Sequence, residues 1–286
     1  MLEPMSPAAL HTYPAGLLSR ALDVAGRLAN DAAEVITATA GRSASPGAKA
    51  NPFDWVTETD RTLERHTRRV LLGEFPGTDV LGEEYGGIDV DGKPLALPGD
   101  ADGPELLWIV DPVDGTSNYV AGVPWCCYSL ALVDAAGPLV GVIADPYQSQ
   151  IYAAARGLGV RANGRPVTAN PLTTLAGALM FTEPSRPGQH PPTAILMERA
   201  LAAHCGLRVA GSSALAITQV VLGRAAVAVL PSAGYQVWDV AGALALALEA
   251  GLRVTDLDGN DSPLPLNGLV VAPPAVLQSA LEMIAN

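Results

Sequence analysis

Apolar residues near the start of the chain recur with the spacing of an amphipathic helix. Between Leu17 and Ile36 they fall three or four positions apart, which predicts one long helix that ends before the Gly-, Ser- and Pro-rich stretch 41–52. A second helix is predicted to begin just after Asp60, which occupies the position of an N-cap. The apolar face of this second helix comprises Leu63, Val70 and Leu71.

From Trp108 onward the helical spacing gives way to short, nearly continuous apolar runs. Runs of this kind, bounded by Gly, Pro and Asp, are typical of buried strands. They cover residues 108–111, 126–133, 139–145 and 151–155. The segment 157–167 predicts a hairpin, because Asn163 and Gly164 form a two-residue turn signal between strand-like segments.

The second half of the chain alternates helix-like and strand-like segments. Helices are predicted at 193–206, 213–224 and 238–251, and a strand at 225–231. Gly206 and Gly251 would close the first and the last of these helices. Alternation of this kind predicts a layered α/β architecture.

Two segments rich in Gly, Pro and polar residues, 85–105 and 183–193, are interpreted as loops. A boundary is placed near 168–172, although no flexible linker marks it. We therefore expect an N-terminal α+β part, 1–168, and a C-terminal α/β part, 169–286, packed as one compact unit.

The composition of the chain argues against several classes of protein function. The 286 residues are 49% apolar and 16% charged, so the chain is able to bury a sizeable core. Its net charge of −12 argues against a protein that coats nucleic acid and against a polybasic membrane anchor. Asp134 and Pro138 interrupt the apolar run 125–144, so it predicts two strands rather than a membrane span. Three cysteines without a CxxC pair, and no basic residue before Arg20, predict a cytoplasmic protein without a secretory signal.

Several carboxylates gather in short segments flanked by turn residues. The segment 108–118 places Asp111 at the end of an apolar strand, where Pro112 is expected to end the strand pairing. Asp114 follows three residues later, and two carboxylates around a backbone carbonyl suit a hard cation. If a helix begins near Thr116, the N–H groups of its first turn form a phosphate site beside that cation. Phosphoryl transfer requires this pairing of a cation site with an anion site.

The other acidic segments are less specific by themselves. A Gly-Glu-Glu turn at 82–84 is more often surface than site, and Asp239 before an Ala-rich helix is explained by an N-cap alone. The four histidines are far apart, and the chain has no GxSxG nucleophile motif. The residues therefore favour attack by a metal-activated water over a covalent intermediate.

Taken together, these segments resemble the inositol monophosphatase family, within the superfamily of lithium-sensitive, magnesium-dependent phosphatases. The resemblance rests on WIVDPVDGTSNY at 108–119 and WDVAG at 238–242, supported by 54–60, 82–84 and the hairpin 157–167. It extends from about Lys49 to Gly259. It implies an alternating α-β-α-β-α sandwich of the inositol monophosphatase and fructose-1,6-bisphosphatase type.

The resemblance also implies a set of metal ligands. Glu83, Asp111 and the carbonyl oxygen of Val113 would hold a first Mg²⁺. Asp111, Asp114 and Asp239 would hold a second, and Glu83 would help to hold a third, weaker one. By the same resemblance, Mn²⁺ would replace Mg²⁺ and Li⁺ would inhibit.

Catalytic roles follow from the same resemblance. Glu83 and Thr116 would position the attacking water, and Asp60 would hydrogen-bond Thr116 to make it a better proton acceptor. The backbone amides of Gly115 and Thr116 would receive the phosphate oxygens. Glu84 would support the site, and Lys49 would lie on a loop that approaches the metals.

The substrate side differs from inositol-specific relatives, in which a glutamate binds ring hydroxyls at the position of Ser232. A neutral, shorter side chain there changes discrimination between hydroxylated substrates. The substrate-side residues implied by the resemblance are Asp114, Gly115, Thr116, Gly211, Ser212, Ser213 and Ser232. We therefore expect a small polyol or sugar phosphate similar to inositol 1-phosphate, with histidinol phosphate or a nucleotide 3′-phosphate as alternatives. A homodimer is expected from the family, and a metal-binding interaction protein without turnover is the alternative from another class.

Overall fold

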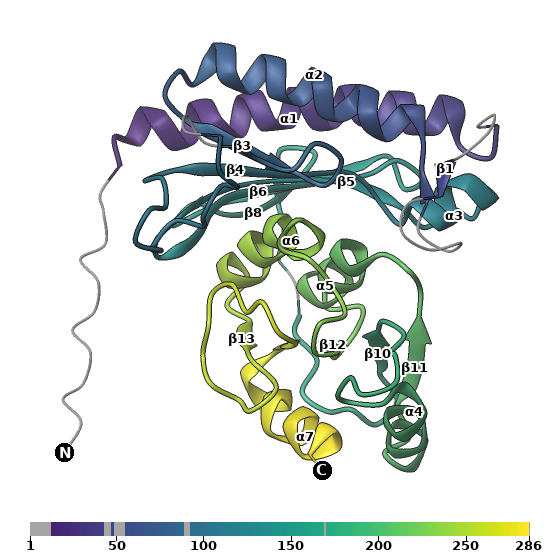
Figure 1. The fold of residues 1–286 in the computed structure, drawn as a ribbon. Coiled ribbons are helices and arrows are strands. Elements are labelled where there is room, and N and C mark those ends of the chain that lie inside the picture. The colour runs from purple at the N-terminus through teal and green to yellow at the C-terminus, as the bar shows by residue number, and fades with distance from the viewer. Residues whose placement is uncertain (1–12, 43–46, 49–54, 89–91, 169, 286) are drawn as a thin grey trace, which may run out of the picture.

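The computed structural model describes residues 13–42, 47–48, 55–88, 92–168 and 170–285. Helices and sheets alternate through five layers (Figure 1). One pair of helices covers the outer face of each sheet, and a middle pair lies between the two sheets. The predicted α-β-α-β-α sandwich is therefore confirmed.

The first sheet has seven strands in the order β3-β4-β5-β6-β7-β8-β9. They are β3 (Asp79–Gly82), β4 (Leu107–Asp114), β5 (Cys127–Asp134), β6 (Gly137–Asp145), β7 (Gln150–Ala155), β8 (Gly159–Ala162) and β9 (Arg165–Pro166). Helices α1 (Ala15–Thr39) and α2 (Glu58–Glu74) cover its outer face (Figure 1). The buried face of α1 includes Ala21, Val24, Leu28 and Ile36, as the helical spacing predicts.

The second sheet has five strands in the order β11-β10-β12-β14-β13. They are β10 (Leu179–Thr182), β11 (Gly206–Val209), β12 (Val227–Leu230), β13 (Arg253–Thr255) and β14 (Leu269–Ala272). Helices α4 (Thr193–Ala202) and α7 (Pro274–Ile284) cover its outer face. Helices α5 (Ser213–Val221) and α6 (Val237–Glu249) fill the layer between the sheets, and all residues of α5 and most of those of α6 are buried.

Small residues let α6 approach the first sheet closely. A Cβ at Gly141 of β6 would lie 2.2 Å from the carbonyl oxygen of Gly242. A Cβ at Gly242 would in turn lie 2.6 Å from the hydroxyl oxygen of Ser129 on β5. Glycine at both positions therefore allows α6 to pack closely on the first sheet. This packing also sets the position of Asp239, three residues before Gly242.

Two helix starts differ from the sequence prediction. Asp60 is not the N-cap of α2: Thr57 is, and the Asp60 side chain accepts a hydrogen bond from the Thr57 N–H at 2.9 Å. Asp239 likewise is not the N-cap of α6, because its side chain accepts a hydrogen bond from the N–H of the N-cap residue Gln236 at 2.6 Å. Both aspartates therefore occupy the N3 position of a capping box, three residues after the N-cap residues Thr57 and Gln236.

The end of α4 also differs from the sequence prediction. Helix α4 ends at Ala202 instead of being closed by Gly206, which begins strand β11. The chain leaves the helix through His204, whose φ is 56°. The hairpin of β8 and β9 is confirmed, with Asn163 and Gly164 both at positive φ in its turn. Among the described helices, none has the length and hydrophobicity needed to span a membrane.

Candidate functional site

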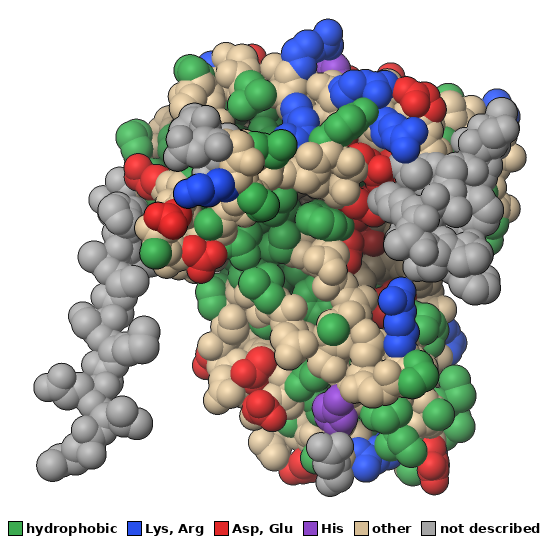
Figure 2. Space-filling view, viewed as in Figure 1, with side chains coloured by type: hydrophobic (Ala, Val, Ile, Leu, Met, Phe, Trp, Pro, Cys, Tyr) green, Lys and Arg blue, Asp and Glu red, His purple; other side chains and the backbone are tan. Residues whose placement is uncertain are grey.

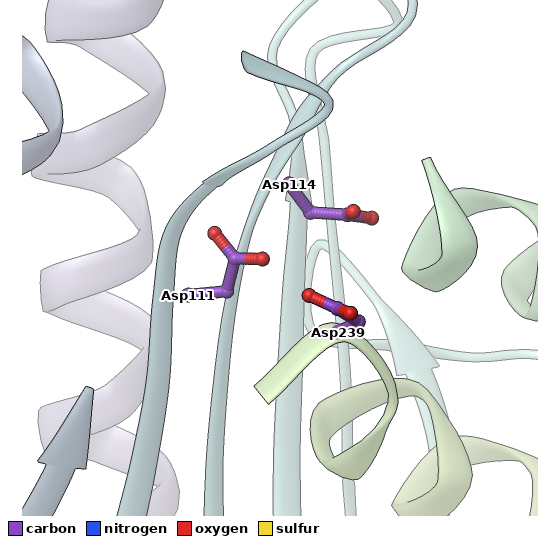
Figure 3. Close-up of side chains that lie close together, drawn as sticks. All are labelled: Asp111, Asp114 and Asp239. Carbon is purple, nitrogen blue, oxygen red and sulfur yellow. The ribbon is translucent and has the colours of Figure 1, made fainter. Parts of the chain in front are cut away.

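Three carboxylates converge between the first sheet and α6. Asp111 and Asp114 extend from β4, and Asp239 extends from the first turn of α6 toward them (Figure 3). One carboxylate oxygen from each residue lies within 4.8 Å of the other two. On the molecular surface, acidic side chains line the hollow between the upper and lower layers (Figure 2).

An irregularity in β4 brings its two aspartates together. The pairing register with β5 shifts between Asp111, opposite Ser129, and Asp114, opposite Cys127. Pro112 has no N–H to pair, and the Val113 N–H instead donates to the Asp111 Oδ1 at 3.0 Å. The predicted break in strand pairing at Pro112 is therefore confirmed, but the strand does not end there, because β4 continues through a bulge to Asp114.

Asp114 is held by the start of α5. Its Oδ2 accepts hydrogen bonds from the Ser212 hydroxyl at 2.5 Å and from the Ala214 N–H at 2.8 Å. Burial raises the pKa of Asp114 to about 7, although these two hydrogen bonds oppose the shift. A deprotonated Asp114 is thus stabilised by specific donors, but its charge has been removed from water.

Asp111 faces further negative charge. Burial raises its pKa well above the usual range, and the charges of Glu83 and Asp114 raise it further. Glu83 directly follows β3, and its N–H donates to the Val110 carbonyl at 3.3 Å. The turn after β3 therefore places a fourth carboxylate beside the three that converge.

Asp60 and Thr116 lie next to this cluster. Thr116 is the first residue of α3 (Thr116–Ala121), and its hydroxyl donates to the Val113 carbonyl at 3.0 Å and approaches Asp60 Oδ1 at 3.4 Å. Burial, with a smaller contribution from the charge of Glu83, raises the pKa of Asp60 to about 6. A hydroxyl that has two acceptors is well placed to orient a water molecule through its own lone pairs.

The conformation of Gly115 brings the substrate-side segment against α3. Gly115 is the N-cap of α3 with a φ of 93°, and a Cβ there would lie 2.9 Å from the Gly211 carbonyl oxygen. The Asn118 amide donates to the carbonyls of Trp125 and Ala210 at 2.8 Å each. The loop that precedes α5 is therefore fixed beside the N-terminus of α3.

The remaining predicted residues have distinct placements. The Ser232 hydroxyl accepts a hydrogen bond from the His190 N–H at 3.0 Å, so this serine is tied to the segment 183–193. Ser213 is the first residue of α5, beside Ser212. The Glu84 N–H donates to a buried glutamate of α2. Lys49 lies outside the described residues.

Glu183, which directly follows β10, was not predicted from the sequence. Its Oε1 accepts a hydrogen bond from the Gly211 N–H at 3.2 Å. Burial raises its pKa to about 7, and the charge of Asp239 contributes. Its position directly after the apolar run 179–182 is the same signal that identified Asp111, but it lay inside a segment interpreted as a loop.

The donor set suits a divalent cation. Carboxylate oxygens are the ligands that Mg²⁺ prefers, and clustered carboxylates with raised pKa values repel one another until a cation neutralises them. The three cysteines of the chain are buried and free. Within the described residues, Asp111, Asp114 and Asp239 form the group with metal-site geometry.

This layered fold, with a carboxylate cluster between its sheets, defines a phosphatase of the inositol monophosphatase type. The model of the inositol monophosphatase family matches residues 17–286. The chain therefore belongs to the inositol monophosphatase family, and the resemblance read from the sequence is confirmed.

Individual relatives agree with the family assignment. Inositol-1-monophosphatase ImpA of Mycolicibacterium smegmatis is 30% identical over 268 residues, 89% of this chain and 91% of that protein. Nus factor SuhB of Xylella fastidiosa is 33% identical over 218 residues, 74% of this chain and 72% of that protein. The solved structure of a Thermotoga maritima IMPase superimposes with a TM-score of 0.80 at 25% identity, over 92% of this chain and 96% of the other.

Proposed function

We propose that this protein is a Mg²⁺-dependent phosphomonoesterase that hydrolyses a small polyol or sugar phosphate similar to inositol 1-phosphate. The convergence of Asp111, Asp114 and Asp239 within 4.8 Å carries the proposal, because a dianionic phosphate approaches such a cluster only after cations have reversed its charge. Family membership supports the same reaction class.

Each residue of the site has a role in this proposal. Asp111, Asp114, Asp239 and Glu83, with the Val113 carbonyl, would hold the cations. Bound Mg²⁺ supplies Lewis-acid activation of the phosphoryl group and of the attacking water.

The protein's own groups then orient the reactants. Thr116 Oγ1 would accept a proton from the attacking water as its own hydroxyl proton passes to Asp60 Oδ1, 3.4 Å away. The backbone N–H groups of Gly115 and Thr116, at the start of α3, would bind the phosphate oxygens. The segment 211–213, fixed by Asn118 and Glu183, would contact the alcohol part of the ester.

The substrate is proposed from the donor set. Glu183 offers a carboxylate acceptor beside Gly211, and Ser232 offers a hydroxyl on the loop bonded to His190; acceptors of this kind would suit a hydroxylated substrate. Histidinol phosphate and nucleotide 3′-phosphates are the alternative esters.

The deciding experiment measures phosphate release from a panel of phosphomonoesters. The panel contains inositol 1-phosphate, glycerol phosphates, hexose phosphates, histidinol phosphate and a nucleotide 3′-phosphate, each with Mg²⁺, Mn²⁺, EDTA, or Mg²⁺ plus Li⁺. We expect Mg²⁺-dependent release that Li⁺ inhibits and that Asp111→Asn abolishes. Release by Asp111→Asn at the wild-type rate would refute the mechanism.

A folded protein that binds Mg²⁺ but releases phosphate from no ester would instead support a non-catalytic binding role. We further propose a homodimer in the cytoplasm, as the family implies, and light scattering with purified protein tests the dimer.

A further inference from the structure

An ion pair with a buried carboxylate and a half-buried guanidinium lies on the α2 side of the turn that carries Glu83. The Glu64 side chain on α2 is 0% exposed, and Arg68 Nε donates to Glu64 Oε1 at 2.8 Å. Neither residue belongs to the proposed ligand set. Burying a charge is costly unless hydrogen bonds satisfy it, so the partners of this pair identify its purpose.

The pair is bonded to the backbone on both sides of Glu83. Glu64 accepts from the N–H groups of Glu84 at 2.7 Å and Tyr85 at 3.2 Å. Arg68 donates to the carbonyl of Val80 at 2.9 Å and also to the carbonyl of Gly86. Strand β3 before Glu83 and the turn after it are thus joined to the same pair of side chains.

Gly82 allows this close approach. A Cβ at Gly82 would lie 2.2 Å from Glu64 Oε1, well inside van der Waals contact. The Gly82 N–H also donates to the Gly86 carbonyl at 3.0 Å, which closes the turn. A larger residue at position 82 would therefore displace the Glu64 carboxylate from this position.

A gain in folding stability does not by itself explain why an ion pair is present here. Replacing a buried ion pair with apolar side chains of similar volume is often neutral or stabilising, because the desolvation cost disappears with the charges. What apolar side chains cannot reproduce is the set of directed bonds to the backbone around Glu83. Groups that orient a metal ligand in this way commonly change metal affinity by about 10- to 100-fold when they are removed.

We propose that Glu64 and Arg68 are positioning residues that hold the Glu83 turn against Asp111 and so set the affinity of the site for Mg²⁺. The inference rests on the proposed function, because it assumes that Glu83 binds a cation. Glu64 and Arg68 act through Glu83 and touch neither substrate nor metal.

The test compares two ion pairs of the same protein in which a half-buried arginine meets a buried carboxylate. The double variant Glu64→Met/Arg68→Met removes the pair under the Glu83 turn. The matched control, Asp134→Leu/Arg156→Met, removes the pair between β5 and the end of β7, in which Arg156 donates to Asp134 at 2.9 Å. Isothermal titration with Mg²⁺ alone measures affinity, and thermal unfolding in EDTA measures stability.

We expect the Glu64/Arg68 double variant to bind Mg²⁺ at least about tenfold more weakly than the wild type, and the control to bind it with wild-type affinity. Wild-type Mg²⁺ affinity in the folded double variant would overturn the inference. Absence of Mg²⁺ binding by the wild type would instead refute the proposed function.

A second variant keeps the test decisive if the double variant does not fold. Arg68→Lys retains the charge but loses the planar fork that reaches Glu64 and both carbonyls. We expect it to weaken Mg²⁺ binding several-fold and to raise the Mg²⁺ concentration needed for half-maximal activity, with a smaller change in kcat at saturating Mg²⁺. Unchanged Mg²⁺ affinity in Arg68→Lys would overturn the inference.

Discussion

Replacing Asp111 with Asn is expected to stabilise the protein when no divalent cation is present, although it removes a proposed ligand. The oxygens of Asp111, Asp114 and Asp239 lie within 4.8 Å of one another. Two unit charges at that separation repel by about 3 kcal/mol at an effective dielectric constant of about 20. Removing one charge relieves at least one such repulsion, which corresponds to an increase in Tm of roughly 5 to 10 °C for a chain of this size.

The sign of the pH dependence follows from the raised pKa values. Burial raises the pKa of Asp114 to about 7, and burial with neighbouring charges raises that of Asp111. Unfolded Asp has a pKa of about 4, so between about pH 4 and 7 the folded state binds more protons than the unfolded state. The stability of the metal-free wild type therefore falls as the pH rises through this window. The advantage of Asp111→Asn should be large at pH 8 and small at pH 5.

Thermal unfolding in EDTA at pH 8 and pH 5 measures this effect. Asp134→Asn is the control, because Asp134 is also buried but accepts two hydrogen bonds from Arg156 at 2.9 Å each. It should lower Tm at both pH values, since it breaks a buried pair. A Tm of Asp111→Asn at or below that of the wild type in EDTA at pH 8 would show that repulsion among the carboxylates does not govern the metal-free protein.

Other changes have equally direct outcomes. Mg²⁺ should raise the wild-type Tm more at pH 8 than at pH 5.5, because cation ligands must be deprotonated; unfolding scans at both pH values check this. Thr116→Val should lower kcat by at least about tenfold with little change in Mg²⁺ affinity, as steady-state kinetics and titration would show. Gly115→Ala should cost about 1–3 kcal/mol in chemical denaturation, because alanine disfavours a φ of 93°. Glu183→Ala should raise KM several-fold by releasing the Gly211 N–H, as steady-state kinetics at saturating Mg²⁺ would show.

Periodicity predicted most helices and strands and a layered α/β architecture, whereas the order of the five layers came from the family resemblance. The spacing from Leu17 to Ile36 located α1, because a single apolar stripe determines which face is buried. The hairpin at 157–167 followed from its Asn-Gly turn. Helix starts were less predictable, because Thr57 and Asp60 are both good capping residues and only backbone geometry decides which is the N-cap.

Long-range contacts account for what the sequence could not reveal about the site. Asp111 and Asp114 were found from local motifs. Their approach to each other depends on a bulge at Pro112. The missing N–H of proline indicates a break in pairing there, but it does not show that the strand continues. Glu183 is joined to the site through Gly211, far along the chain. Glu64 lies on the buried face of α2 with Leu63 and Leu71, but the bonds that it makes depend on a turn twenty residues away, which its own helix does not reveal.

The carboxylate cluster connects the first sheet to the helices that lie between the two sheets. Asp114 belongs to β4 of the first sheet but is held by Ser212 and Ala214 at the start of α5, and Asp239 comes from α6 in the layer between the sheets. A cation bound by both β4 and α6 would link the first sheet to the middle helical layer. Because it binds only the folded protein, its binding free energy would add to the free energy of unfolding. Depletion of divalent cations would then shorten the lifetime of the protein against proteases as well as stop turnover.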